Sequence, residues 1–511
     1  MTLDISRQTV STTQPILDSF LEQGIECDMI LPDYCHDVVK ILKCSVTPVV
    51  LSAQLSGNRL QAEGNAAVRL YYLSEDGELR CYEQKYPFEK TAELREMPVR
   101  PVIEAEARLD YVNCRAMSRR RVDVRGAVTV HLKVLGQKEQ SIVSGAEGMG
   151  VCLKSMCVPV TRLSGNARRL FTVREELEPV PGHPPVENIL HAFGCTALNE
   201  VRIIPGKIIA KGELRLQILY RPVSDGGKVL PETMEYRLPI SQIMDVEGAQ
   251  EQSICQVSFE PADLSVTLKN EGSDGEEKLS LAAQLLAKAF VWSEQTLTLA
   301  EDCYSTGYAC DHTAAAMELP QMLSALEERR QQKMTIELPE EAVGEILALW
   351  AQTETCEIDD DAAELISKLT LHLLACDGEG TSLYFERPLE LRLPVTLSEE
   401  EVLLDPAAQL EGVSFTRSGE QLEITCEMRF AGRKCIGRQV SAVTEIMVDE
   451  TRPNPERSAA LTIFFGRKGE SVWDIARQYS TSMEAVMEEN ALADEILDEN
   501  RMLMIPMIGV R

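Results

Sequence analysis

Cysteines, histidines and clustered acids are the residues of this 511-residue chain that could do chemistry. Two groups combine thiols with imidazoles: Cys27, Cys35, His36 and Cys44, and further along Cys310 with His312. Zinc sites usually pair ligands two to four residues apart on a tight knuckle, and no Cys-x-x-Cys pair occurs in the sequence. We therefore expect buried structural thiols and no bound metal.

Paired carboxylates could serve as a general acid and base, and acidic runs occur at 359–361 and 399–401. Both lie in polar stretches, so we expect solvated surface there. The sequence contains no Gly-x-Ser-x-Gly elbow, no phosphate-binding Gly-x-x-x-x-Gly-Lys-Ser/Thr loop and no His-Glu-x-x-His motif. The glycines of 145–150 fit a turn better than a phosphate site. We predict that the chain is not an enzyme, has no catalytic residue and needs no cofactor.

Charge narrows the range of partners. The chain has 51 Lys and Arg against 81 Asp and Glu, a formal charge of −30, which repels phosphate backbones and anionic membranes. Nucleic acid is not an expected partner. The arginine-rich stretch 115–125 is the one basic exception, and it fits either solvated side chains or a phosphate or partner patch.

The N-terminal stretch and the cysteine count bear on the compartment. Residues 1–20 include early acids and lack the apolar core of a secretory signal, and no apolar run reaches the roughly 18 residues that span a bilayer. Fifteen cysteines, an odd number, favour free thiols in a reducing compartment. We expect a cytosolic protein with no direct membrane span.

The elements that carry these residues are mainly strands. Residues 122–134 (VDVRGAVTVHLKV) alternate apolar and polar side chains with a period of two, which predicts a half-buried strand. Segments 212–220, 383–395 and 421–430 have the same pattern. The predicted fold class is mainly β, with tandem antiparallel β-sandwich-like repeats.

Internal repetition divides the β-rich part. The strand and Asp-Gly turn of 64–79 recur at 212–229, with Gly64 matching Gly212 and Tyr72 matching Tyr220, and a weaker copy lies at 366–385. The expected organisation is a lead segment at 1–26, three β repeats at 27–172, 173–334 and 335–448, a polar linker at 449–459, and a terminal module at 460–508.

The terminal module reads as strand, helix, helix, strand. Residues 461–465 form a short strand, and Ser471 with Asp474 predicts a helix start. Thr481 and Glu484 fit a capping box for a second helix, and 502–506 close the module as a strand. The first helix has an apolar stripe at i, i+3, i+4 and i+7: Val472, Ile475, Ala476 and Tyr479.

Residues 461–506 resemble a LysM module, a small α+β (βααβ) fold that commonly binds N-acetylglucosamine-containing glycans. The usual Pro-Gly-Asp before the first helix is Lys468-Gly469-Glu470 here, and the usual Pro-Gly-Gln is 499–501, where we expect Asn500 to be able to adopt the left-handed conformation. The acidic second loop weakens a sugar site. Trp473 lies one position off the apolar stripe, so we expect partial exposure, as a core flank or a partner anchor. Candidate contacts for a protein or glycan are Arg467, Lys468, Gly469, Glu470, Ser471, Trp473, Asn490, Asp494 and Asn500.

Segments 112–130, 171–190 and 299–308 resemble the SPOCS domain, the repeated module of spore-coat morphogenetic proteins, and SPOCS repeats followed by one LysM are the layout of the SipL-like family. The first two repeats carry the resemblance, and the third only in outline. The resemblance implies a non-enzymatic scaffold at the forespore surface, with a SpoIVA-like basement protein and other coat proteins as partners. The alternative is a peptidoglycan-binding LysM protein.

Overall fold

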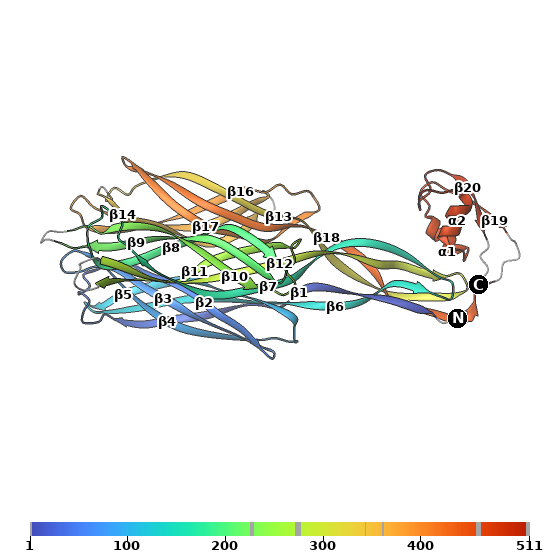
Figure 1. Cartoon of the computed structure of the whole chain (residues 1–511), viewed down its shortest axis with the longest axis horizontal. Helices are drawn as coiled ribbons and strands as arrows, with labels where there is room; N and C mark the ends of the chain where they lie inside the picture. The colour runs from blue at the N-terminus through green and yellow to red at the C-terminus, as the bar shows by residue number, and fades with distance from the viewer. Residues whose placement is uncertain are drawn as a thin grey trace.

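A computed structural model describes residues 3–224, 229–270, 277–342, 344–359, 362–455 and 461–506. The chain forms a β body, a narrower β stalk and a small helical module at the end of the stalk (Figure 1). Both expected features, mainly antiparallel β structure and a terminal βααβ module, are confirmed.

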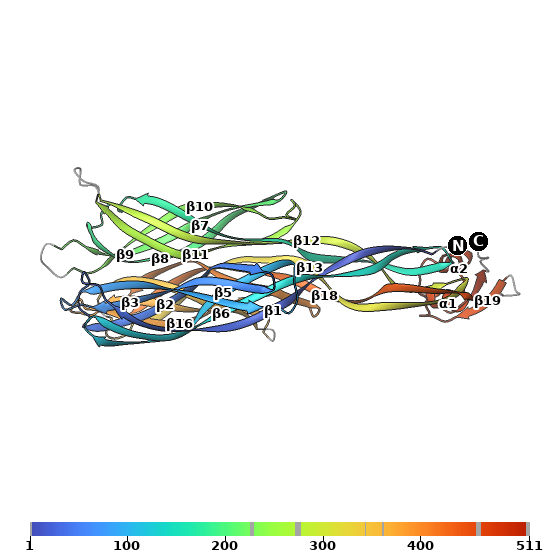
Figure 2. The same ribbon diagram turned by 90° about the horizontal axis from the view of Figure 1, so that it is seen from below.

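The body consists of three sandwiches, each made from six consecutive strands in two three-stranded sheets. The first sandwich has sheets β1-β6-β5 and β2-β3-β4, the second β7-β12-β11 and β8-β9-β10, and the third β13-β18-β17 and β14-β15-β16. Figure 2 shows the second sandwich packed along one side of the other two. The strands of the first are β1 Asp4–Ile30, β2 Lys40–Ser56, β3 Arg59–Leu73, β4 Leu79–Glu93, β5 Val99–Ser118 and β6 Arg121–Glu147.

The other two sandwiches repeat this plan. The strands of the second are β7 Val151–Leu177, β8 Val186–Ile204, β9 Lys207–Pro222, β10 Glu232–Asp245, β11 Ile254–Asn270 and β12 Glu277–Ser305. Those of the third are β13 Tyr308–Glu337, β14 Ile346–Asp359, β15 Glu364–Cys376, β16 Ser382–Pro394, β17 Glu401–Ser418 and β18 Gln421–Pro453.

The joints between sandwiches lie at 148–150 and 306–307, between consecutive long strands. The expected boundaries therefore fall inside strands: 26/27 in β1, 172/173 in β7 and 334/335 in β13. The expected linker begins inside β18, and its residues 456–459 lie outside the described residues. The lead segment at 1–26 is mostly edge strand, because β1 pairs with β6 from Asp4 onward.

The repeated glycine and tyrosine have structural reasons. Gly64 and Gly212 lie opposite β-bulges, and a Cβ on either would collide with the facing carbonyl oxygen, that of Val49 or of Ala197. Tyr72 donates its hydroxyl to the His36 carbonyl at 3.2 Å, and the hydroxyl of Tyr220 lies 3.3 Å from the Pro184 carbonyl. Each tyrosine thus bonds to the loop that joins the first and second strands of its sandwich.

The stalk forms because the first and last strands of each sandwich are longer than the strands between them. The pairs β1/β6, β7/β12 and β13/β18 continue beyond the body as three antiparallel ribbons (Figure 1). Their inward side chains make apolar cores along the stalk, including Ile142, Val160, Leu299, Leu319 and Ala442. Burial of these side chains holds the ribbons together.

The terminal module contains β19 (Leu461–Gly466), α1 (Val472–Gln478), α2 (Met483–Asn490) and β20 (Arg501–Pro506). The predicted apolar stripe of α1 faces the module's core. The predicted start of α1 is confirmed, and the predicted cap of α2 was wrong by one residue. Ser471 is the N-cap of α1 but makes no side-chain cap bond, and α2 is capped by Ser482, which accepts from the Ala485 N–H at 3.2 Å. Thr481 instead donates to the Pro506 carbonyl at 3.0 Å.

Candidate binding surfaces of the terminal module

The two loops that carry most of the predicted contacts are bonded to each other. The Gly469 N–H donates to the Leu497 carbonyl at 2.8 Å, and the Leu497 N–H donates to the Glu470 carbonyl at 3.0 Å. The Val472 N–H donates to the Glu495 carbonyl at 2.8 Å. Backbone donors that could hold a sugar are therefore already satisfied within the module.

Two side chains complete this closure. The Glu470 carboxylate accepts from the Arg467 N–H at 3.0 Å, and the Asn500 amide oxygen accepts from the Lys468 N–H at 2.8 Å. Asn500 does not adopt the expected left-handed conformation, which among the described non-glycine residues of this module is found at Ser480 and Ala491.

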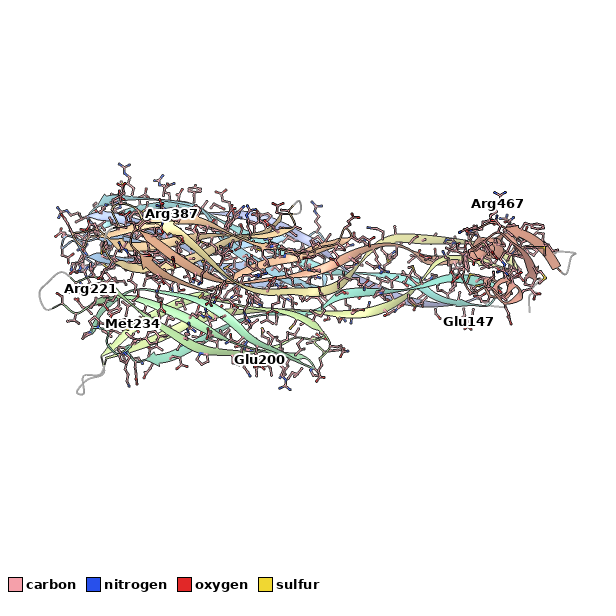
Figure 3. All side chains as sticks on the ribbon, turned by 90° about the horizontal axis from the view of Figure 1, so that it is seen from above. Glu147, Glu200, Arg221, Met234, Arg387 and Arg467 are labelled. Carbon is pink, nitrogen blue, oxygen red and sulfur yellow. The ribbon has the colours of Figure 1, made fainter. Side chains whose placement is uncertain are left out.

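The predicted contact residues separate by exposure. Arg467, Lys468, Gly469, Asp494 and Asn500 are exposed, and Glu470 and Ser471 are half-buried. Figure 3 shows Arg467 pointing away from the stalk. Asn490 is buried: its amide donates to the Val486 and Met504 carbonyls at 2.8 and 2.7 Å and accepts from the Met504 N–H at 2.7 Å. With all these bonds made, Asn490 joins α2 to β20 and leaves little for a ligand.

Trp473 is only 2% exposed, so the expectation of partial exposure was wrong. Its indole N–H donates to the Asp302 carboxylate at 2.8 Å, and its ring meets that of Tyr304 edge-on at 4.7 Å. Both partners are at the stalk end of β12. The surface of Trp473 that the module alone would leave open is covered by the chain's own stalk.

Further bonds reinforce this contact. The Arg477 guanidinium donates to the same Asp302 oxygen at 2.8 Å, and the Tyr304 hydroxyl donates to the Thr481 carbonyl at 2.7 Å. Burial raises the pKa of Tyr304 well above its usual range, so the hydroxyl remains a donor. We call the group Asp302, Tyr304, Trp473 and Arg477 the latch. It fixes the helical side of the module on the stalk.

The opposite side of the module is an apolar sheet face. Ile463 and Phe465 on β19 are 54% and 75% exposed, and Met502 and Met504 on β20 are 55% and 37% exposed. They form direct cross-strand pairs, Ile463 with Met504 and Phe465 with Met502. This surface was not predicted, although LTIFF (apart from Thr462) and MLMIP place apolar residues on both sides of the sheet, which a sheet with only one buried side does not need.

The basic stretch is largely neutralised within the first sandwich. Arg119 pairs with Glu75 at 2.7 Å, Arg120 lies 3.7 Å from Asp33, and Arg121 pairs with Asp28. Arg125 pairs with Asp123 at 3.1 Å. These ion pairs favour the interpretation as ordinary surface over a phosphate site.

The two groups of cysteines and histidines singled out in the sequence are not arranged as metal sites in the described residues. All fifteen cysteines are free thiols, and within the described ranges no three His, Cys, Asp or Glu side chains are arranged to hold a metal ion. Burial raises the pKa of thiols such as Cys27 and Cys426, which makes them less reactive. In the part of the chain that the structure describes, no helix could cross a bilayer.

Fold and surfaces together define an array of β-sandwiches that presents one small binding module. Comparison with known families identifies the parts: residues 37–117 and 185–269 match the SipL, SPOCS domain family, and residues 467–506 match the LysM domain. The chain therefore carries two SPOCS-domain segments and a C-terminal LysM domain. Searches of curated proteins and of solved structures returned no match.

The matched segments have a structural meaning. They cover β2–β5 of the first sandwich and β8–β11 of the second, and leave out the long strand pairs that build the stalk. The third sandwich has the same strand order without a family match. SPOCS and LysM domains are non-catalytic binding domains, and the SPOCS family is associated with sporulation.

Proposed function

We propose that this chain is a non-enzymatic scaffold of spore-coat assembly that links coat layers to a SpoIVA-type basement protein at the forespore surface. The SPOCS and LysM matches support a sporulation role, and the LysM domain is the proposed docking module. In this role the chain acts in the mother cell.

The open apolar sheet face of the LysM domain carries the proposal. Four neighbouring apolar side chains, one of them three-quarters exposed, are unusual on a small polar module and are typical of a protein interface. Methionines adapt their shape to a partner, and Phe465 supplies a rigid anchor. Arg467 and Lys468 follow Phe465 after Gly466 and would form the polar rim.

Trp473 has a different role in this proposal. Asp302 and Tyr304 of the stalk already cover Trp473. Through these contacts Trp473 orients the module so that the sheet face stays open. A partner that used Trp473 would first have to replace its contacts with Tyr304 and Asp302.

The test is a quantitative binding assay between the full chain and a purified SpoIVA-type protein. Phe465→Ser should weaken binding by about 1–2 kcal/mol, roughly tenfold, as expected for an interface anchor. The matched control is Ile496→Ser, because Ile496 is 61% exposed on the same domain but lies in the second loop. Equal binding by both variants and the wild type would remove the sheet face from the docking site.

Peptidoglycan is the second candidate partner, favoured by the LysM match itself. The loop closure by Gly469, Leu497 and Val472 argues against it, because those donors are occupied. Co-sedimentation of the chain with purified cortex peptidoglycan tests this function. Binding that survives Phe465→Ser but is lost on changing the exposed loop residues would favour the glycan.

A further inference from the structure

The end of the first sandwich farthest from the LysM domain is unusually apolar. β1 runs from the stalk to this end, where the loop 31–39 joins it to β2 (Figure 1). Four apolar side chains are exposed around it: Ile30 at 64%, Tyr34 at 80%, Val39 at 65% and Met117 at 60%. We call these four residues the apolar tip.

The two sister sandwiches show that the fold does not require these residues. The Leu31 N–H donates to the Arg120 carbonyl, and in the third sandwich the Leu338 N–H donates to the Glu420 carbonyl in the same way. Leu31 and Leu338 are therefore equivalent, and the residue before each is Ile30 or Glu337. The turn bonds from Cys35 to Pro32 and from Ala342 to Pro339 likewise match Tyr34 with Glu341. The third sandwich thus has carboxylates where the first has Ile30 and Tyr34.

The second sandwich agrees. Continuing the β7/β12 register places Glu178 at the position of Ile30, and the turn bond from His183 to Val180 places Gly182 at that of Tyr34. Met117 is the extra residue of a bulge between Ala116 and Ser118. The corresponding strands of the other two sandwiches, β11 and β17, have no bulge here. At the position that follows the equivalent of Ala116 they have Lys269 and Ser418. The apolar tip is a local addition to a shared scaffold.

The charges around the tip are of both signs and are paired. Arg119 pairs with Glu75, Arg120 lies between Asp33 and Asp37, and Arg121 pairs with Asp28. Such a surface offers no excess of positive charge to an anionic membrane. Because it carries both acids and arginines, a two-fold contact between copies can bring acids of one chain against arginines of the other.

Net charge also favours an end-on contact between copies. Two chains of −30 repel each other along their sides, but an end-on contact keeps most of their acids farther apart than a Debye length of about 10 Å. The tip is at the end of an elongated molecule, which suits this geometry (Figure 2).

We propose that the apolar tip binds the same tip of a second copy of this chain. The product is a two-fold dimer with the two bodies joined end to end and the LysM domains at the outer ends. Four side chains make a contact smaller than a standard interface, so the dimer is weak, with a dissociation constant of roughly micromolar order. One dimer would then present two LysM sheet faces pointing apart.

Sedimentation velocity of the full chain over a concentration series tests the dimer. Ile30→Glu and Tyr34→Glu introduce residue types that the third sandwich already has at these positions, so both should fold. Each should weaken dimerisation at least tenfold, and Met117→Ser should act in the same direction. Tyr111→Glu is the control, because Tyr111 is 55% exposed on the same sandwich away from the tip.

Small-angle scattering of the dimer should show nearly twice the maximum dimension of the monomer. A wild-type chain that stays monomeric across the series overturns the proposal, as does a dimer that Ile30→Glu leaves intact. A dimer abolished by Phe465→Ser places the contact on the LysM domain instead. A monomer that co-floats with phosphatidylglycerol vesicles identifies the tip as a membrane contact, and also overturns it.

Discussion

Two aromatic junctions hold this molecule together, and they differ in size and in chemistry. The first joins all three sandwiches: Tyr71 from the first, Phe193 and His191 from the second, and Trp350 and His372 from the third. The second is the latch, with one aromatic pair and one carboxylate. The larger junction packs the three sandwiches of the body together, whereas the latch bonds the LysM domain to the stalk.

The larger junction should respond to protons. His191 and His372 are buried among rings, and burial holds both pKa values below the usual range, that of His372 at about 4. In the latch, the Trp473 indole, the Arg477 guanidinium and the Cys303 backbone N–H donate to Asp302, and the His312 Nε2 atom lies 3.7 Å from the same carboxylate. Acid should therefore loosen the body through its imidazoles.

Removing Trp473 should give the largest difference in stability between the LysM domain and the body. Trp473→Ala removes a buried ring from the core of the LysM domain, at a cost of about 3–5 kcal/mol to that domain. Hydrogen exchange should rise across 461–506 and remain low in the sandwiches. Phe465→Ser, on the open face, should change LysM stability by less than about 0.5 kcal/mol. Simultaneous loss of protection in the body would show that the domain and body are one unit.

Acid should act on the larger junction. The neutral form of His372 is favoured in the folded state, and the unfolded chain, with a pKa of about 6.5, binds the proton more readily. Stability is therefore complete above about pH 6.5 and falls toward pH 4, by up to about 3 kcal/mol from this group. Urea unfolding at about pH 7 and pH 4.5 measures the loss. If His372→Gln has the same pH slope as the wild type, another group is responsible.

Removing the carboxylate of Asp302 should have the next largest effect, on the docking of the LysM domain to the stalk. Asp302→Ala removes a charge-assisted acceptor from Trp473 and Arg477, which costs about 2 kcal/mol of docking. Asp302→Asn keeps an acceptor for the indole and should cost less. Acrylamide quenching of Trp473, with Trp292 and Trp350 replaced by Phe, reports the opening. Equal quenching of all three proteins would deny the carboxylate a role.

Removing the hydroxyl of Tyr304 should have the smallest effect on the docking of the LysM domain. Tyr304→Phe keeps the ring against Trp473 but loses the bond to the Thr481 carbonyl, for about 1 kcal/mol. The same quenching assay should show a small rise, below that for Asp302→Ala. A larger effect than that of Asp302→Ala would mean that the hydroxyl dominates the latch.

Periodicity in the sequence predicted the fold well. Alternation in 122–134 predicted a strand that the structure extends to Arg121–Glu147, and the stripe beginning at Val472 predicted α1. The cap of α2 was displaced by one residue, because Thr481 and Ser482 are both able to cap. The repeat boundaries fall elsewhere because each sandwich begins with a long strand, β1, β7 or β13, that runs through both stalk and body and that the sequence repeats did not include.

The candidate site was harder to predict. Asp302 and Trp473 are 171 residues apart, so nothing local indicates their bond, and the exposure of Trp473 could not be deduced from its helix alone. The loop residues Arg467 and Lys468 were predicted as contacts because the LysM resemblance indicates them. The sheet face was predictable in principle, because Ile463, Phe465, Met502 and Met504 add a second apolar side to two short strands whose other side already faces the core.

Hydrogen exchange of the full chain, alone and with a SpoIVA-type protein, tests the central claim most directly. The latch predicts that α1 is already protected in the chain alone and gains little, whereas β19 and β20 gain protection when the partner binds. New protection confined to α1, with both strands unchanged, would contradict the account, because it would place the partner on the side that the stalk covers.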